Sequence, residues 1–389
     1  MESIVITDFG VSLGKTSERI VVRGHRPRLE LIEGGPQLLL PVDLPLSASP
    51  TLKVVTSDGV RQPPSDERKR KPKSDQAWKP PQIELPFFRV SEIVIASPGV
   101  SLSTDLIEAC CERGIRISFL TPGGRPYAMI SSPMLTATVI TRREQLAAYL
   151  DRRGLEISKT IVKGKLNNQA NLLKYFGKYL KTTGQAIYRQ LRDKIDSLET
   201  AREEVDRVEG SRIDDARPAL MAIEGGSGRL YWNGVKALLA ERVAFESREH
   251  RGATDEVNSA LNYGYGILYT QVWGAIMNAG LEPFAGFLHV DRPGKPSLVL
   301  DLIEEFRQPI VDRSVIAYIN KGSKIEVRDG LLTEESRQAI ASAVLERLES
   351  EAMFKGKRYR LKSIIQIQAR SLASFLRGEG PYKSFSWKW

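Results

Sequence analysis

Carboxylates and one sheltered imidazole in the second half of the chain are the residues best suited to chemistry. Glu224 ends an apolar helical run in the segment MAIEGGSGRLYW, and the glycines after it would let the backbone of a large ligand come close. His289, one of three histidines in 389 residues, follows the apolar stretch EPFAGFL. Asp301 and Glu304 share one face of a helix predicted over SLVLDLIEEF. Two acids on an apolar helix are costly unless a cation or several donors meet them.

These residue types together favour a hard divalent cation. Carboxylates with one imidazole suit magnesium or manganese, whereas zinc is disfavoured because the only cysteines are the adjacent Cys110 and Cys111. Such an ion would lie against a phosphodiester, neutralise the charge that grows on the phosphate and hold an attacking hydroxyl in line. The residues therefore predict phosphoryl transfer on nucleic acid.

Each of these residues also has a purely structural interpretation. An acid near a helix end commonly only faces solvent, which is the alternative for Glu224. A sheltered histidine is more often hydrogen-bonded than metal-binding, which is the alternative for His289. Glu305 is expected to point away from the other two acids of its segment. His250 is flanked by charges and is expected to be exposed and without a role.

The chain is basic, with 57 Lys and Arg against 47 Asp and Glu and a net charge of +10, so polyanions are plausible partners. A predicted helix places Lys174, Lys178 and Lys181 on one face, with Tyr175 and Tyr179 one step round, as in a stripe that follows phosphates. A solvated lysine face explains the same spacing equally well.

A second pair of basic residues, Arg248 and Arg251, precedes Asp255 and Asn258. The side chains of the latter two are expected to cap or brace a helix beside the site. The candidate DNA-binding residues are thus Lys174, Lys178, Lys181, Arg248 and Arg251.

The elements that must position these residues follow a β-rich start. The first 47 residues alternate as half-buried strands do, with breaks at Gly, Pro and Asp. Residues 87–130 predict a strand, a helix that opens near Ser103 or Thr104, a strand over residues 115–120 and a last strand beyond a Gly-Gly turn. We expect residues 1–130 to form a β-sandwich-like domain.

Residues 48–86 interrupt this domain. They are rich in Pro, Lys, Arg and Ser and cannot bury enough apolar surface to order themselves, so a basic, flexible insertion is expected. The run RKRKPK within it is interpreted as a solvated linker, with contact to nucleic acid as the alternative.

From about residue 138 the hydrophobic period changes to 3.6, which predicts an all-α domain over residues 131–389. The expected fold is therefore α+β with two domains, the helical one larger and catalytic. No apolar run approaches the ~18 residues of a membrane span. The N-terminus lacks the pattern of a secretory signal, so a cytoplasmic location is expected.

Several segments in combination resemble the CRISPR-associated endonuclease one family, the integrase of spacer acquisition. The segments are EGGSGRLYW, RGATDEVNSALNYGYGILY, AGLEPFAGFLH, LVLDLIEEFRQPIVDRSVIAYIN and the closing YKSFSWKW. The resemblance spans most of residues 212–389, and the predicted order of strands and helices before it agrees with the family. The insertion at residues 48–86 is longer than the turn usual there.

The resemblance implies an activity and a set of catalytic residues. The metal ligands would be Glu224, His289 and Glu304, and Asp301 would be a further acid beside the metal. The family forms homodimers, two of which flank a dimer of CRISPR-associated protein two. That assembly joins short captured double-stranded DNA to the repeat array through attack of a 3′-hydroxyl on a phosphodiester.

Two other functions remain open at this point. A metal-dependent nuclease that cuts branched DNA in repair would use the same ligands with water as the nucleophile. A basic, non-catalytic DNA-binding scaffold would need none of the acids.

Overall fold

The computed structural model describes residues 2–24, 30–31, 55–56, 59–60, 82–130, 132, 139–250 and 252–388. By its contacts the chain divides into two units, Met1–Glu33 with Pro81–Trp389, and Gly34–Pro80. In the second unit, strand β5 (Val55–Thr56) pairs with β6 (Gly59–Val60). Most of the predicted flexible insertion lies outside the described residues.

The end of the predicted insertion is a strand. β7 (Gln82–Pro86) pairs antiparallel with β3 (Arg19–Arg23). Its sequence QIELP alternates, with Ile83 half-buried and Leu85 buried, and this alternation gives the strand an apolar face for the core. These five residues therefore belong to a sheet and not to a flexible segment.

Two sheets and one helix make up the N-terminal region. The first sheet has five strands in the order β11-β10-β8-β1-β4. The second has four in the order β7-β3-β2-β9. The remaining bounds are β1 (Glu2–Ile6), β2 (Ser12–Thr16), β4 (Glu30–Leu31), the 3₁₀ turn η1 (Phe87–Arg89), β8 (Val90–Ile95), β9 (Ser101–Leu102), α1 (Thr104–Glu112), β10 (Arg116–Leu120) and β11 (Pro126–Ile130).

The core of this region lies between the strands and α1. Apolar side chains of both sheets and of α1 form one cluster, in which Ile4, Ile20 and Ile93 are fully buried. Cys110 is buried in α1, and burial raises the pKa of its thiol to about 12. Cys110 therefore acts as a small apolar residue, as expected.

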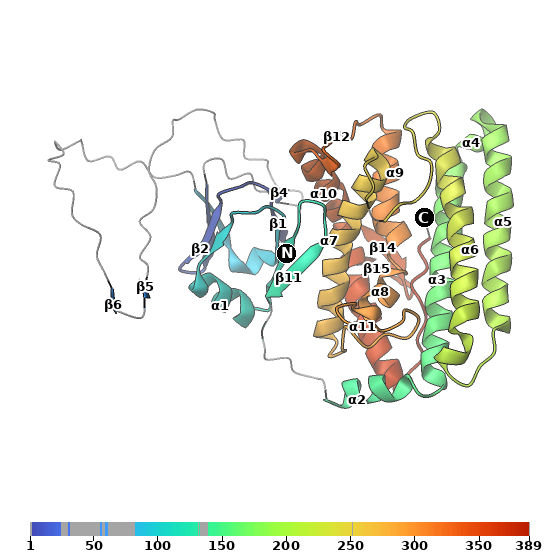
Figure 1. Cartoon of the computed structure of the whole chain (residues 1–389), viewed down its shortest axis with the longest axis horizontal. Coiled ribbons are helices and arrows are strands. Elements are labelled where there is room, and N and C mark those ends of the chain that lie inside the picture. Colours follow the sequence, from blue (N-terminus) through green and yellow to red (C-terminus); the bar gives the residue numbers. More distant parts are fainter. Residues whose placement is uncertain are drawn as a thin grey trace. The chain divides into compact units, whose positions relative to one another are not determined.

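The rest of the chain is largely helical. Its elements are α2 (Val139–Ala148), α3 (Arg152–Gly177), α4 (Leu180–Thr183), α5 (Gln185–Arg207), α6 (Ile213–Leu239), α7 (Glu256–Asn278), α8 (Ser297–Ile303), the π-helical η2 (Arg307–Asp312), α9 (Arg313–Asn320), β12 (Val327–Arg328), β13 (Leu331–Leu332), α10 (Glu334–Glu349), β14 (Glu351–Phe354), β15 (Lys357–Arg360) and α11 (Leu361–Leu376). Figure 1 shows α3, α5 and α6 side by side.

The predicted order, a β-sheet region and then a helical region, is confirmed. Two hairpins, β12–β13 and β14–β15, interrupt the predicted all-α region. Their arms are two and four residues long, too short for an alternating pattern to stand out. In the part of the chain that the structure describes, no helix is both long and apolar enough to cross a membrane.

Helix α7 is buried on nearly every side and contacts both regions. It packs against β10 and β11 as well as α8, α10 and α11. A Cβ atom at Gly266 would lie 1.5 Å from the carbonyl oxygen of Gly124, in the turn between β10 and β11. The side chain of Gln271 donates to the buried carboxylate of Glu92 on β8. Glycine is thus required at position 266 because the turn rests on the helix backbone.

Candidate active site

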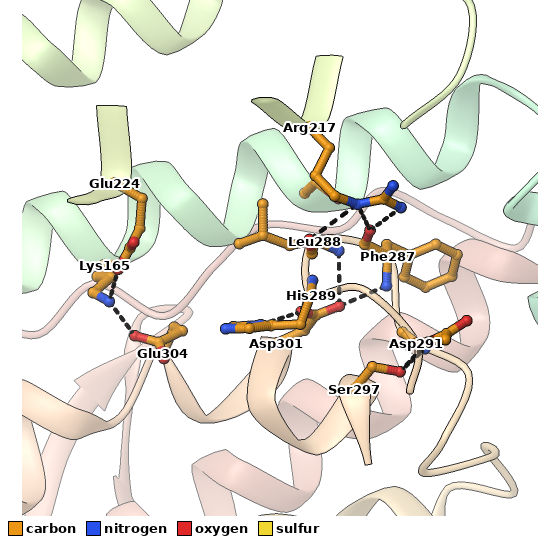
Figure 2. A network of polar contacts seen from close by, with 12 residues as sticks. Lys165, Arg217, Glu224, Phe287, Leu288, His289, Asp291, Ser297, Asp301 and Glu304 are labelled. Carbon is orange, nitrogen blue, oxygen red and sulfur yellow. Dashed lines mark hydrogen bonds and ion pairs between the residues drawn. The ribbon is translucent and has the colours of Figure 1, made fainter. Parts of the chain in front are cut away.

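Two predicted acids meet at a lysine. Figure 2 shows Lys165 of α3 between Glu224 of α6 and Glu304, which follows the last residue of α8. The Lys165 ammonium donates to Glu224 Oε1, and its Nζ lies 2.6 Å from Glu304 Oε2. The three side chains are only 12%, 20% and 5% exposed. The carboxylates of Glu224 and Glu304 therefore face each other across one cation.

Glu304 is held as an anion by its neighbours. Its Oε1 accepts from Arg307 Nε at 2.9 Å. Burial opposes ionisation, but Arg307, Lys165 and His289 outweigh it and lower the pKa of the Glu304 carboxyl. Burial likewise opposes the charge of Lys165, yet Glu304 and Glu224 raise the pKa of its ammonium. Glu304 and Lys165 are therefore both charged in the folded protein.

Glu224 lies inside a helix and not at its end, so that part of the prediction is wrong. Helix α6 continues through Gly225, Gly226 and Gly228, because packing on α3 and α5 outweighs the low helix propensity of glycine. A Cβ atom at Gly225 or Gly228 would meet nothing within 4 Å. The glycines thus leave open space on α6 next to Glu224, as the sequence predicted.

His289 is oriented by Asp301. The Asp301 carboxylate is fully buried and accepts from the backbone N–H groups of Phe287, Leu288 and His289 at 2.6, 3.0 and 2.9 Å. It also lies 2.7 Å from His289 Nδ1. With Asp301 as its acceptor, Nδ1 carries a proton, which leaves Nε2 as the ring nitrogen that can face a metal ion. In Figure 2 the ring extends from Asp301 toward Glu304 and Lys165.

Arg217 of α6 holds the same loop from the other side. Its guanidinium donates to the carbonyl oxygen of Phe287 at 3.0 Å and to that of Leu288 at 3.1 Å. Asp214 pairs with Arg217 in turn. Sequence reasoning missed Arg217, for which the sequence gives no signal. It also missed Lys165, whose signal is a single charge between the buried Ile161 and Leu172 on one face of α3.

Glu305 points elsewhere, as predicted. Its carboxylate accepts from Gln368 Nε2 at 2.6 Å, from the Phe385 backbone N–H at 2.8 Å and from the Tyr382 hydroxyl. Burial raises the pKa of Glu305 to about 7, although these three donors act in the opposite direction. Asn168 of α3 joins the arrangement, donating to the carbonyl oxygens of Glu305 and Phe385 at 2.8 and 2.9 Å. The C-terminal segment is thus fixed directly behind Glu304.

The donor set fits a divalent cation only after one rearrangement. Within the described ranges, no three His, Cys, Asp or Glu side chains stand close enough together to hold a metal ion. The Lys165 ammonium already takes the place of a cation between Glu224 and Glu304. Glu304 Oε2 is buried and accepts no well-directed hydrogen bond, and Nε2 of His289 is the ring nitrogen that is not bound to Asp301. Two carboxylates and one imidazole are suitable ligands for magnesium or manganese. Asp301, with both oxygens engaged, stands outside this set.

The three candidate DNA-binding lysines do not lie on one helix. Helix α3 ends at Gly177, so Lys174 lies on α3, Lys178 in the following turn and Lys181 on α4. Lys174 pairs with Glu199 of α5. The Lys178 ammonium lies 4.6 and 4.7 Å from the ring centroids of Tyr175 and Tyr179. Lys181 is exposed.

The bracing role expected near the start of α7 is confirmed. Asp255 caps the helix by accepting from the Asn258 backbone N–H at 2.9 Å. Arg248 donates to Asn258 Oδ1 at 2.9 Å and to Asn262 Oδ1 at 2.6 Å. Arg251 lies outside the described residues.

His250 is exposed, as predicted, yet it responds to the charges of the site. Desolvation and the guanidinium groups of Arg248 and Arg307 lower the pKa of its imidazole to about 4. His250 is therefore neutral near pH 7.

Comparison with known proteins gives one consistent result. Residues 70–346 match the family described as CRISPR associated protein Cas1. The CRISPR-associated endonuclease Cas1 1 of Archaeoglobus fulgidus is 36% identical over 301 residues, which cover 74% of this chain and 87% of that protein. The CRISPR-associated endonuclease Cas1 of Korarchaeum cryptofilum is 34% identical over 305 residues, covering 76% and 87%.

Solved structures share the fold at lower identity. A CAS1 protein from Thermotoga maritima superimposes with a TM-score of 0.68 at 18% identity, covering 99% of this chain and 100% of that one. A casposase bound to an integration product has a TM-score of 0.72 at 19% identity, covering 99% and 93%.

Proposed function

Because the chain belongs to the CRISPR associated protein Cas1 family, we propose that it is a metal-dependent DNA endonuclease and integrase of CRISPR adaptation. It would insert short captured double-stranded DNA into the repeat array through attack of a 3′-hydroxyl on a phosphodiester. The single observation that carries this proposal is the meeting of Glu224 and Glu304 at one cation, beside an imidazole that Asp301 orients.

Glu224, Glu304 and Nε2 of His289 would hold the divalent cation, magnesium or manganese. When bound, the ion supplies charge neutralisation at the phosphate and orientation of the attacking oxygen. The chain's other residues fix these ligands. Asp301 sets the tautomer and direction of His289, and Arg307 holds one oxygen of Glu304.

The surface around the ligands suits a nucleic-acid backbone. The glycines of α6 leave open space beside Glu224, so a phosphodiester would approach without meeting side chains there. Lys174, Lys178, Lys181, Arg248 and Arg251 remain our proposed DNA contacts, which would neutralise phosphates. Residues 1–130 and 131–389 are proposed as dimerisation and catalytic domains.

The proposed assembly follows from the family. The chain would form a homodimer, and two homodimers would flank a dimer of CRISPR-associated protein two in the cytoplasm. One solved structure with this fold carries the name Cas6-RT-Cas1–Cas2 complex, with a TM-score of 0.66 at 17% identity.

The test replaces each proposed ligand separately. Glu224→Ala, His289→Ala and Glu304→Ala should each lower strand transfer by about 100-fold or more. Loss of a ligand weakens metal binding, and the negative charge that develops on the phosphate is then no longer stabilised by the metal. The assay uses a repeat-containing plasmid, a short duplex with free 3′ ends and Mg²⁺ or Mn²⁺. Gel-shift affinity for DNA should fall only modestly. Asp206→Ala, which removes an exposed carboxylate paired with Lys163 on the surface, is the matched control and should keep full strand transfer.

The same assay separates the other functions. Cleavage of branched DNA without any joining of 3′ ends would make the protein a repair nuclease with water as the nucleophile. Equal activity in all three ligand variants would leave a DNA-binding scaffold as the better description.

A further inference from the structure

We infer that Lys165 is a built-in occupant of the proposed metal site, and that a divalent cation binds there only by displacing the Lys165 ammonium. This inference rests on the proposed function, since it concerns the same carboxylates. It concerns a residue that is not itself a ligand and that decides how tightly the site binds an ion.

The geometry places the ammonium where an ion would bind. Nζ of Lys165 contacts Glu224 Oε1 and Glu304 Oε2 at once, and the lysine side chain is 12% exposed. Two buried carboxylates that face each other without a cation repel strongly and are poorly solvated. Lys165 relieves this repulsion in the metal-free protein, and a divalent ion would relieve it in the same place. The two cations therefore compete for one position.

The backbone of α3 cannot carry the ammonium away. A Cβ atom at Gly164 would lie 2.5 Å from the Cβ atom of Ser384, so α3 is in close contact with the C-terminal segment. One turn further on, Asn168 donates to two carbonyl oxygens and accepts from the Trp387 N–H at 2.8 Å. Displacement must therefore occur through rotation of the lysine's own flexible four-carbon side chain.

Arg307 provides a contrast on the same carboxylate. It contacts Glu304 through Oε1, on the side away from the Lys165 contact, and its guanidinium lies 4.6 Å from the ring centroid of Tyr265. It carries the same charge as Lys165 but forms no ion pair or hydrogen bond with Glu224 among the described residues. Removing Arg307 therefore changes the local charge without vacating the position between the two acids.

The test measures the binding of Mn²⁺ alone to the full-length, metal-free protein by isothermal titration calorimetry. Lys165→Gln should lower the Kd for Mn²⁺ by about tenfold or more, because no buried ion pair has to be broken first. Lys165→Arg, which keeps the charge, should leave the Kd unchanged or raise it. Lys163 lies two residues before Lys165 on α3 and pairs on the surface with Asp206 of α5. Lys163→Gln breaks that exposed pair and should leave the Kd for Mn²⁺ unchanged.

Arg307→Gln decides between displacement and general electrostatics. Under displacement it lowers the Kd by much less than Lys165→Gln does. An equal effect of both variants, or an unchanged or higher Kd in Lys165→Gln, would overturn the inference.

Thermal unfolding gives a second readout. Metal-free Lys165→Gln should melt below the wild type, and saturating Mn²⁺ should raise its Tm by more than it raises that of the wild type. Lys165→Met, which keeps the side-chain volume, should show the same pattern, and an equal Mn²⁺-induced rise in wild type and both variants would count against displacement.

Glu224→Ala and Glu304→Ala separate the two proposals. If neither weakens Mn²⁺ binding, the proposed metal site itself fails. If both weaken it while Lys165→Gln changes nothing, only the role of Lys165 fails.

Discussion

Asp301 and Glu304 illustrate how two acids three residues apart take different tasks. The predicted helix gave both the same face, and with it the same role beside a cation. Helix α8 ends at Ile303, so Glu304 lies in the following turn and reaches Lys165 and Arg307. Asp301 lies inside the helix, and both of its carboxylate oxygens accept hydrogen bonds from the loop that carries His289. Asp301 is therefore a positioning residue in this structure.

A conservative change at Asp301 tests that role. Asp301→Asn puts an amide –NH₂ where an oxygen now accepts hydrogen bonds, so either the loop or His289 loses its partner. Calorimetry should show Mn²⁺ affinity about 10- to 100-fold weaker, as for other residues that orient metal ligands. Asp291→Asn, which alters an acid paired with Ser297 on the same loop, is the comparison variant and should bind Mn²⁺ as the wild type does. Wild-type affinity in Asp301→Asn would show that the imidazole is oriented by other contacts.

The sequence predicted the acids and the imidazole but not the cations that meet them. Glu224, His289 and Glu304 stand out because charged or polar residues in apolar segments require partners. Lys165 meets Glu224 and Glu304 from α3, whereas Arg217 of α6 holds the loop at His289, and no spacing rule links either position to the predicted residues. Such contacts depend on how helices cross, which periodicity does not specify. The end of α6 was also misjudged, because tertiary packing overrides glycine propensity.

At the scale of elements, the turn after α8 separates two neighbouring acids. Glu304 faces the site, whereas Glu305 anchors the C-terminal segment to α3 and α11. The segment is thus a support for the site, although its sequence, rich in aromatic residues, indicated only a resemblance. Loss of the hydrogen bonds of Glu305 would therefore shift the backbone of Glu304, which is the adjacent residue.

Removal of one hydroxyl tests this support. Tyr382→Phe should lower the free energy of unfolding by about 1–3 kcal/mol, because a buried carboxylate loses a donor. The pKa of Glu305 is raised to about 7, so its burial destabilises the fold increasingly as the pH rises from the unfolded pKa to about 7, and the penalty stays constant above that. The Tyr382 hydroxyl counteracts that penalty, and its loss should therefore cost more at pH 8 than at pH 5. Urea unfolding at both pH values measures the difference.

Tyr127→Phe is the matched control, since Tyr127 is 60% exposed on β11 and should unfold as the wild type does at both pH values. A cost in Tyr382→Phe that is equal at pH 5 and pH 8 would contradict the proposed interaction with ionised Glu305.

At the scale of the whole molecule, α7 links the sheet region to the helices. The turn at Gly124 rests on Gly266, and Val5, Val94, Ala96 and Leu120 of the sheet region join the apolar cluster of the helices. The sequence predicted both regions, since each has a clear hydrophobic period. The sequence did not predict which face of α7 contacts which region, because α7 is apolar on nearly every side and such a helix has no preferred face.

A methyl group at position 266, where α7 contacts the turn at Gly124, should lower the free energy of unfolding. Gly266→Ala places a Cβ atom 1.5 Å from a backbone oxygen, so the turn or the helix must shift. We expect a loss of about 2 kcal/mol or more in the free energy of unfolding, measured by urea denaturation. Gly225→Ala, in the interior of α6 with nothing within 4 Å of the added atom, should instead gain up to about 1 kcal/mol. Equal behaviour of the two variants would contradict the close contact at Gly124.

The burial of α7 has a consequence for how the molecule assembles. A helix whose partners come from strands before it and helices after it gains little from either set alone. α7 therefore becomes ordered only when both sets of partners are in place, which couples the formation of the sheets to that of the other helices. The sheet region and the helical region should therefore unfold together in a single cooperative transition, and neither region alone should form a stable fragment.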